Sequence, residues 1–250
     1  MVNNKFYFTL FLTLFLGASV YSQVLIAAVF GDKLNSPDLE FGLEGGYNWS
    51  DISELNNGKN LSEFNLGFYF DIRLKDQWFL YTGVLVKGRL GAGELSSDDL
   101  SLLGITIQDE EGTYSQKISY FMVPALIKYR FRNRVYLELG PQFGLRHKAF
   151  VEFTAEEGDI EFRTRQNNKD AINRLGAGLT FGTGYRLSDK AAGITLGLKY
   201  YYGFTNVYKD ISGPKNSSLF LKCNIPIGVK KSQELRKQKA LEKENDLKKE

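Results

Sequence analysis

The feature that most constrains this chain is a series of segments in which apolar and polar residues alternate. Eight such runs of about 11 to 15 residues follow one another between residues 39 and 229. Residues i, i+2 and i+4 of a strand share one face, so each run predicts a long strand with one apolar face. Long strands joined by alternating short and long connections are typical of an outer-membrane barrel. The sequence therefore predicts an all-β fold, an eight-stranded antiparallel transmembrane β-barrel.

The alternation also fixes where the expected strands and connections lie. The strands are expected at residues 39–50, 62–75, 77–90, 117–131, 134–151, 172–187, 192–205 and 218–229. The short turns are expected at 75–77, 132–134 and 188–191, and the long loops at 51–61, 91–116, 151–171 and 206–217. Barrels of this kind keep short turns and both termini in the periplasm, so the long loops are expected outside the cell.

A soluble sandwich or lipocalin-like barrel would show similar alternation. The expected strands are longer than the five or six residues that are usual in globular sheets. Aromatic residues also gather near the strand ends, as in the two interfacial girdles of membrane barrels. These are Tyr47, Trp49, Trp78, Phe79, Phe121, Phe131, Tyr202 and Phe204. Both observations favour a membrane barrel, whose outer apolar face contacts outer-membrane lipid.

The start of the chain has the composition of an export signal. Lys5 is the only charged residue before residue 32, an apolar run covers residues 6–16, and small residues precede a cleavage point after Ser22. We interpret residues 1–22 as a cleaved signal peptide, because the apolar run is short for a transmembrane anchor. Residues 23–38 are then expected to form an N-terminal arm, and residues 39–229 the barrel.

The end of the chain is strongly charged. Residues 230–250 contain eight bases and five acids, and Glu244 and Lys248 have the i, i+4 spacing of a helical ion pair. We expect a charged, partly helical periplasmic tail, through which the protein could bind a periplasmic or envelope protein. The formal net charge of +3 is too small to suggest a nucleic-acid partner. The single Cys223 excludes an intrachain disulfide.

Charged residues gather on the expected inner face. Ten bases and four acids fall there: Glu40, Glu44, Asp71, Arg73, Lys87, Arg89, Lys128, Arg130, Glu138, Arg146, Arg174, Arg186, Lys199 and Lys222. The interior of an eight-stranded barrel is just wide enough to be filled by side chains. The charges therefore form either a plug of mutually satisfied ion pairs or a narrow cationic pore for small anions.

Irregularities are expected in the barrel wall and in the loops. Pro124, Pro141 and Pro226 fall inside expected strands, where proline predicts a bulge or kink, and a 132–134 turn would place Pro124 opposite Gln142. Loops 91–116 and 151–171 are rich in Asp and Glu, and each contains a hairpin-like pattern that would extend the strands beyond the membrane. Clustered carboxylates attract divalent cations, although ordinary solvated loop charge explains them equally.

The sequence offers no catalytic or cofactor-binding constellation. His147 is the only histidine, and no Ser or carboxylate is placed beside it as a general acid–base site requires. Cys and His spacings for metals, a phosphate-binding loop and a GxSxG motif are all lacking. We therefore expect no enzyme, no cofactor and no catalytic, cofactor-binding or metal-binding site residues.

Two segments carry a resemblance to a known family. SYFMVPALIKYRF (119–131), followed by a three-residue turn and YLELGPQFG (136–144), resembles the PorT-type outer-membrane β-barrel family, and GLEGGYNWS (42–50) resembles the opening strand of that family. The resemblance spans residues 39–229 and implies an eight-stranded outer-membrane barrel. The founding member of that family is an accessory of a protein secretion system, although most members have no assigned biochemistry.

The expected function follows from the barrel rather than from any motif. We expect an integral outer-membrane protein with a structural, interaction or envelope-assembly role, such as a secretion accessory. The alternative is a narrow porin-like channel for small solutes, including small anions.

Overall fold

The computed structural model describes residues 35–227, apart from residues 37, 109, 158–159 and 189–192. The expected signal peptide (1–22), most of the expected arm (23–38) and the expected tail (230–250) lie outside the described residues. Asn35 is described, and it joins the first and last strands: its Oδ1 accepts a hydrogen bond from the backbone N–H of Phe41, and its Nδ2 donates to the carbonyl of Ile227.

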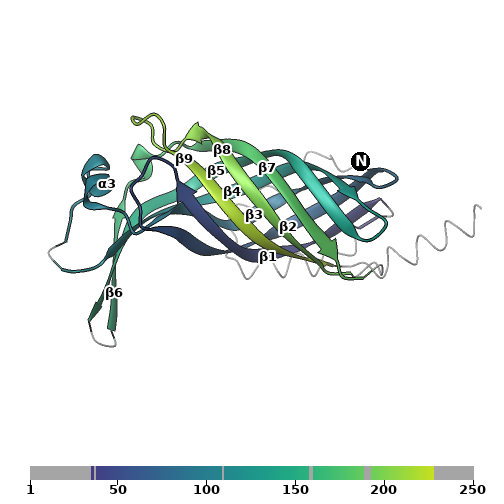
Figure 1. Cartoon of the computed structure of the whole chain (residues 1–250), viewed down its shortest axis with the longest axis horizontal. Helices are drawn as coiled ribbons and strands as arrows, with labels where there is room; N and C mark the ends of the chain where they lie inside the picture. Colours follow the sequence, from purple (N-terminus) through teal and green to yellow (C-terminus); the bar gives the residue numbers. More distant parts are fainter. Residues whose placement is uncertain (1–34, 37, 109, 158–159, 189–192, 228–250) are drawn as a thin grey trace, which may run out of the picture.

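The described residues form nine antiparallel strands (Figure 1). They are β1 (Leu39–Ile52), β2 (Lys59–Lys75), β3 (Trp78–Gly93), β4 (Thr113–Arg130), β5 (Val135–Glu157), β6 (Ile160–Asn167), β7 (Leu175–Arg186), β8 (Thr195–Asn206) and β9 (Lys215–Pro226). The order in the sheet is β4-β3-β2-β1-β9-β8-β7-β5-β6, and β4 also pairs with β5. Eight strands therefore close a ring, as the alternation predicts, and β6 lies outside it.

The two ends of the barrel carry connections of different length. At one end, which we term the turn end, residues 76–77, 131–134 and 187–194 join strands, and β1 begins and β9 ends there. The connection at 187–194 is longer than the expected 188–191 turn. At the opposite end, the loop end, the connections are 53–58, 94–112, 168–174 and 207–214. The expected alternation of turns and loops is present in the folded chain.

The outer face of the barrel is an apolar belt. In β8 every second residue is exposed and apolar while its neighbours are buried, which is the reverse of a water-soluble barrel. The belt includes Leu139, Phe143, Leu179, Phe181, Leu196, Leu198, Tyr200, Leu219 and Leu221, all exposed. Aromatic pairs mark its edges: Trp78 with Tyr129 at the turn end, and Tyr202 with Phe204 at the loop end. Phe79 is an exception to the expected girdle, because it is buried inside the barrel.

Two elements project beyond the barrel at the loop end, on the left in Figure 1. The second half of β5 pairs with β6 from Phe150↔Asn167 to Glu157↔Ile160, so the hairpin expected in loop 151–171 is present. In loop 91–116 the hairpin prediction is wrong, because residues 105–108 form no strand and a short helix, α3 (Ser97–Leu102), precedes them. The Ser96 side chain caps α3 in a reciprocal capping box with Asp99. No helix in the described part of the chain is long and apolar enough to cross a membrane.

The prolines do not produce the expected bulges. Pro124 pairs with Gln142 as predicted, and the β4–β5 register continues unchanged beyond it to Ile127↔Leu139. Pro226 is simply the last residue of β9. Bulges lie elsewhere, between Leu85 and Gly88 of β3 and at Ser119/Tyr120, where His147 of β5 is the extra residue. A bulge adds one residue to one strand, so it reverses which residues face inward beyond it.

Candidate functional site

The lumen near the turn end is filled by buried ion pairs, which we term the ionic layer. Six strands contribute one residue each, and every one is at most 4 % exposed: Glu44, Asp71, Lys128, Glu138, Lys199 and Lys222. The Nζ–carboxylate distances are 2.7 Å for Lys199–Glu44, 2.7 Å for Lys128–Asp71 and 2.5 Å for Lys222–Glu138. Three lysines thus face three carboxylates, so the layer has no net charge.

Aromatic rings complete the ionic layer. The ammonium groups of Lys128 and Lys222 lie 4.1 and 4.0 Å from the centre of the Tyr81 ring, and the Tyr81 hydroxyl donates to Glu44. Tyr136 contacts the same two ammonium groups at 4.9 and 5.3 Å. Such cation–π contacts stabilise a cation that has lost its water. The rings of Tyr81 and Tyr136 therefore pack between the charged side chains of the layer.

Most of the expected excess of inner bases lies outside the lumen. Besides the three lysines, only Arg130 and Arg186 of the ten expected inner bases pair with inner carboxylates, at 3.0 Å from Asp71 and 2.8 Å from Glu40. The other five lie elsewhere: Arg73, Lys87 and Arg174 are exposed, Arg89 pairs with Glu63, and Arg146 lies where β5 leaves β7. The bulge after Leu85 explains Lys87 and Arg89, because it reverses the alternation of β3 and places these two residues on the outer face.

The lumen at the loop end is closed by hydrophobic packing, which we term the apolar cap. Strand residues of the cap include Ile52, Leu85, Leu90, Ile118, Tyr120, Met122, Val151, Phe153, Tyr201 and Phe220. Leu100 of α3 and Ile105, which follows it, pack on this cluster from above. The interior near the loop end is therefore mainly apolar, with uncharged polar side chains such as Asn48, Ser50 and Gln116 buried there. The sequence predicted a polar inner face throughout.

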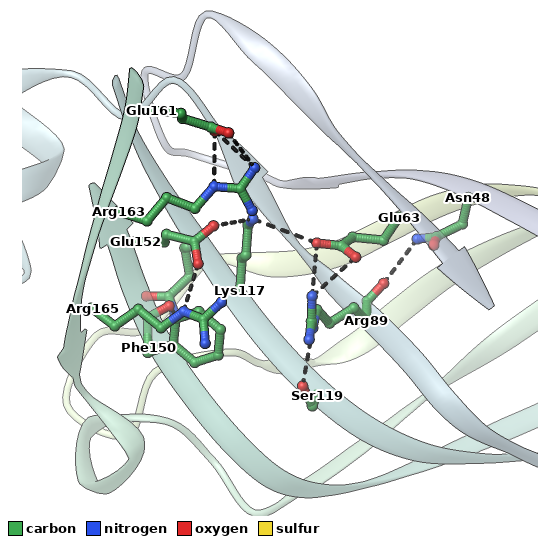
Figure 2. Close-up of polar contacts among 11 residues, drawn as sticks. Asn48, Glu63, Arg89, Lys117, Ser119, Phe150, Glu152, Glu161, Arg163 and Arg165 are labelled. Carbon is green, nitrogen blue, oxygen red and sulfur yellow. Dashed lines mark hydrogen bonds and ion pairs between the residues drawn. The ribbon is translucent and has the colours of Figure 1, made fainter. Parts of the chain in front are cut away.

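A second network of charges crosses the wall of the extended strands (Figure 2). The carboxylate of Glu152 on β5 lies 2.5 Å from Lys117 Nζ on β4 and 2.6 Å from Arg165 Nε on β6. Lys117 also approaches Glu63 of β2, which Arg89 contacts at 3.0 Å. We term these five residues the wall ion-pair chain. It ties the hairpin of β5 and β6 to the barrel.

Burial and charge act in opposite directions on Glu152. Its side chain is 1 % exposed, and burial raises the pKa of the carboxyl, but hydrogen bonds from Lys117 and Arg165 outweigh this and hold the pKa below its ordinary value. Glu152 is therefore a carboxylate at neutral pH. Sequence reasoning missed this chain, although the hairpin pattern in loop 151–171 places Glu152 opposite Arg165.

Several acidic loop residues have structural partners. Asp99 caps α3 and accepts a hydrogen bond from the backbone N–H of Asn56, Glu94 pairs with Lys59, and Glu161 pairs with Arg163. Within the described residues, no group of three or more His, Cys, Asp or Glu side chains is arranged to hold a metal ion. Asp99, Glu94 and Glu161 therefore stabilise the loops in which they lie.

His147 lies on the outer surface as the extra residue of the β5 bulge. Its ring stacks on Phe121, with 4.5 Å between ring centroids. The charged groups that act on it are the bases Lys148, Arg89 and Lys169. Among the described residues no Ser or carboxylate hydrogen-bonds to it, so the arrangement of a general acid–base pair is not assembled there.

Comparisons with known proteins agree with this architecture. The family described as "Outer membrane protein beta-barrel domain" matches residues 32–209, which is more than half of the chain. No curated protein sequence matches the chain.

Several solved structures resemble the fold weakly. Ail of Yersinia pestis, crystallised with a heparin analogue, has 15% identity and a TM-score of 0.38, and the match covers 76% of this chain and 99% of Ail. Neisserial surface protein A has 9% identity and a TM-score of 0.37, covering 75% and 96%. OprG of Pseudomonas aeruginosa has 12% identity and a TM-score of 0.32, covering 77% and 97%.

These likenesses carry no functional information, so the assignment rests on the closed ring of strands and on the family match. Both indicate a protein of the outer membrane whose apolar belt contacts lipid. The chain belongs to the outer membrane protein beta-barrel domain family.

Proposed function

We propose that this protein is a closed barrel that anchors an interaction surface in the outer membrane and conducts no solute. The observation that carries the proposal is the double closure of the lumen. The ionic layer, which contains pairs such as Lys199–Glu44, fills the lumen near the turn end, and the apolar cap fills it near the loop end. An ion would have to cross a neutral layer of buried pairs and then a hydrophobic cluster, and both steps are costly.

The interaction surface is formed by the structures at the loop end, which we place outside the cell. The β5–β6 hairpin and α3 project there, and the wall ion-pair chain holds the hairpin to the barrel. Phe162 on the hairpin is 46% exposed, beyond the strands that close the ring. A hairpin held to the barrel by ion pairs and carrying an exposed aromatic residue suits the binding of another protein.

Three features expected from the sequence extend this proposal: the family resemblance, the signal peptide and the charged tail. The PorT-type resemblance of residues 39–229 supports an accessory role in envelope assembly or secretion, without catalysis. A cleaved signal peptide at 1–22 would deliver the chain, and the charged residues 230–250 would offer a second, periplasmic contact. Comparing crosslinked partners of the full chain with those of a chain ending at Val229 separates a contact of the tail from one of the hairpin.

Recording from planar bilayers tests the closed lumen. The refolded full chain should give no reproducible single-channel steps under conditions in which a general porin does. Reproducible, anion-selective steps would contradict the closed barrel and support the narrow pore. If steps appear, Lys199→Ala should change their selectivity, because Lys199 lies in the lumen.

Site-specific photocrosslinking in cells tests the interaction surface. A photoreactive residue at Phe162 should capture a protein, whereas the same group at Phe181, which is 55% exposed on the apolar belt, should meet lipid. Equal protein capture at the two positions, or none at Phe162, would contradict the assignment of the hairpin.

A further inference from the structure

The wall of the barrel contains a fork on β5. Up to Leu145↔Leu175 the partner of β5 is β7, and from Phe150↔Asn167 onward its partner is β6. Between these points the backbone N–H of Arg146 donates to the carbonyl of Arg174, and residues 147–149 pair with neither strand. In Figure 1, β6 leaves the wall while β7 remains in it. The fork therefore leaves a notch between the two diverging strands.

The notch is lined almost entirely by bases. Its lining residues are Leu145, Arg146, His147, Lys169 and Arg174. Lys169 and Arg174 are exposed, and among the described residues neither has a carboxylate oxygen within 4.0 Å. Asp170, the nearest acid in sequence, forms no ion pair with Lys169 in the described part of the chain. The basic side chains of the notch are therefore available to an anion.

Arg146 gives an independent reason to expect an anion. Its residue is only 8% exposed, and its Nε donates to the carbonyl of Asn173 at 3.3 Å. Its Nη1 is buried and has no hydrogen-bond partner, and no carboxylate among the described residues neutralises it. A buried guanidinium without a counter-charge is costly. An anion held in the adjoining notch would offset this cost.

The level of the notch indicates where the anion comes from. Leu145 and Leu175 form the last apolar pair of the β5–β7 wall, and both are exposed, as is Phe143 below them. The bases of the notch follow directly above this edge of the apolar belt. Acyl chains cover such a belt, and the charged headgroups of lipids lie at its edge, where Lys and Arg are favoured.

We propose that this basic notch binds a phosphate group carried by a glycolipid of the outer leaflet. Lys169 and Arg174 would contact the phosphate oxygens, because Arg and Lys form strong charge-assisted hydrogen bonds with phosphate. The buried Arg146 would attract the phosphate by its positive charge without lying on the exposed side of the notch, and Leu145 and Leu175 would contact the acyl chains. The choice of an outer-leaflet lipid rests on the proposed orientation, in which the loop end lies outside the cell. Binding of the lipid in detergent, however, depends neither on this orientation nor on whether the lumen is closed.

Native mass spectrometry of the refolded full chain in detergent tests the site. The probes are diphosphoryl lipid A, the same lipid after enzymatic removal of its phosphates, and inorganic phosphate. We expect the intact protein to retain diphosphoryl lipid A and to bind the dephosphorylated lipid at least about tenfold more weakly, as loss of two charge contacts predicts. Equal retention of the two lipids would overturn the proposal. Displacement of the lipid by micromolar inorganic phosphate would overturn the lipid as the source.

The matched variants place the site on the molecule. Lys169→Ala/Arg174→Ala should weaken binding of diphosphoryl lipid A by about tenfold. The control Lys75→Ala/Arg132→Ala removes two exposed bases at the turn end and should bind as the unaltered chain does. Both notch side chains can be removed while the backbone hydrogen bond from Arg146 to Arg174 remains. Should the double variant not fold, Arg174→Gln alone provides the comparison, and unchanged binding in it would contradict the assignment.

Discussion

Lys199 Nζ on β8 lies 2.7 Å from Glu44 Oε1 on β1, across a lumen in which both side chains are at most 4 % exposed. β9 lies between these two strands in the sheet, so the pair bridges over β9 inside the lumen rather than joining neighbouring strands. It joins residues that are 155 positions apart in the chain. The pair therefore helps to define how the closed barrel is filled.

Removing one member of this pair should be more damaging than removing both. Lys199→Met leaves the Glu44 carboxylate buried without its closest cation, which typically costs about 3–5 kcal/mol. The double variant Lys199→Met/Glu44→Gln should recover much of that loss, because no uncompensated charge remains. The free energy of unfolding in urea, followed by tryptophan fluorescence in lipid vesicles, measures both. A double variant less stable than Lys199→Met would contradict a plug held by paired charges.

Two glycines should respond differently to alanine. A Cβ on Gly197 would lie 2.0 Å from the Tyr136 hydroxyl oxygen, and the backbone carbonyl of Thr183 would be 2.9 Å away. Overpacking of this kind typically costs about 1–3 kcal/mol, so Gly197→Ala should unfold at lower urea concentration. At Gly45, on the outer face, the nearest atom would be 3.8 Å away, and Gly45→Ala should unfold like the unaltered chain. Equal midpoints for the two variants would show that the lumen is not tightly filled around Tyr136.

The apolar belt predicts a dependence on depth in the membrane. The exposed apolar row extends from Ile194 to Phe204 and has Leu198 near its middle, whereas Tyr202 belongs to the aromatic pair at its loop end. An arginine on the lipid face costs about 2–4 kcal/mol at the bilayer midplane and about 0–1 kcal/mol near the interface. Leu198→Arg should therefore destabilise the protein in vesicles much more than Tyr202→Arg. If Leu198→Arg costs no more than Tyr202→Arg, this face does not lie in lipid.

The attachment of the hairpin should depend on pH through Glu152. Because the folded pKa of Glu152 lies below its ordinary value, its contribution is fully present above the unfolded pKa and is lost as pH falls through the folded pKa. Amide NMR signals of β6 should therefore shift or broaden below about pH 4.5, the usual range of a glutamate. In Glu152→Gln this acid transition should be absent. A transition of equal size in Glu152→Gln would assign it to other carboxyls.

Much of the fold could be predicted from the sequence. In a membrane barrel, the alternation of apolar and polar residues in one strand indicates which side chains face lipid and which face the lumen. The alternation in residues 195–206 indicates which side chains meet lipid without knowledge of any partner strand. The pairing of Pro124 with Gln142 followed from the length of one turn. The β5–β6 hairpin followed from the alternation of its two arms around a turn rich in Glu, Gly and Asp.

The predictions were wrong where a local irregularity interrupts the alternation of a strand, or where an apparent alternation does not form a strand. A bulge after Leu85 places Lys87 and Arg89 outside, and nothing local in the sequence marks the extra residue. The helix α3 has a local signal, the Ser96–Asp99 capping pattern before Leu100, which the interpretation of this loop as a hairpin did not use.

The sequence by itself determined the membrane barrel, its strands and the alternation of its connections, because these depend on local periodicity and on the lipid surroundings. Only the tertiary structure decided what the interior and the fork do. Whether Lys199 meets Glu44, whether Leu100 closes the lumen and whether Arg146 lacks a counter-charge depend on distances between residues remote in the chain. Ring closure sets these distances, and the sequence pattern of a single strand does not contain them.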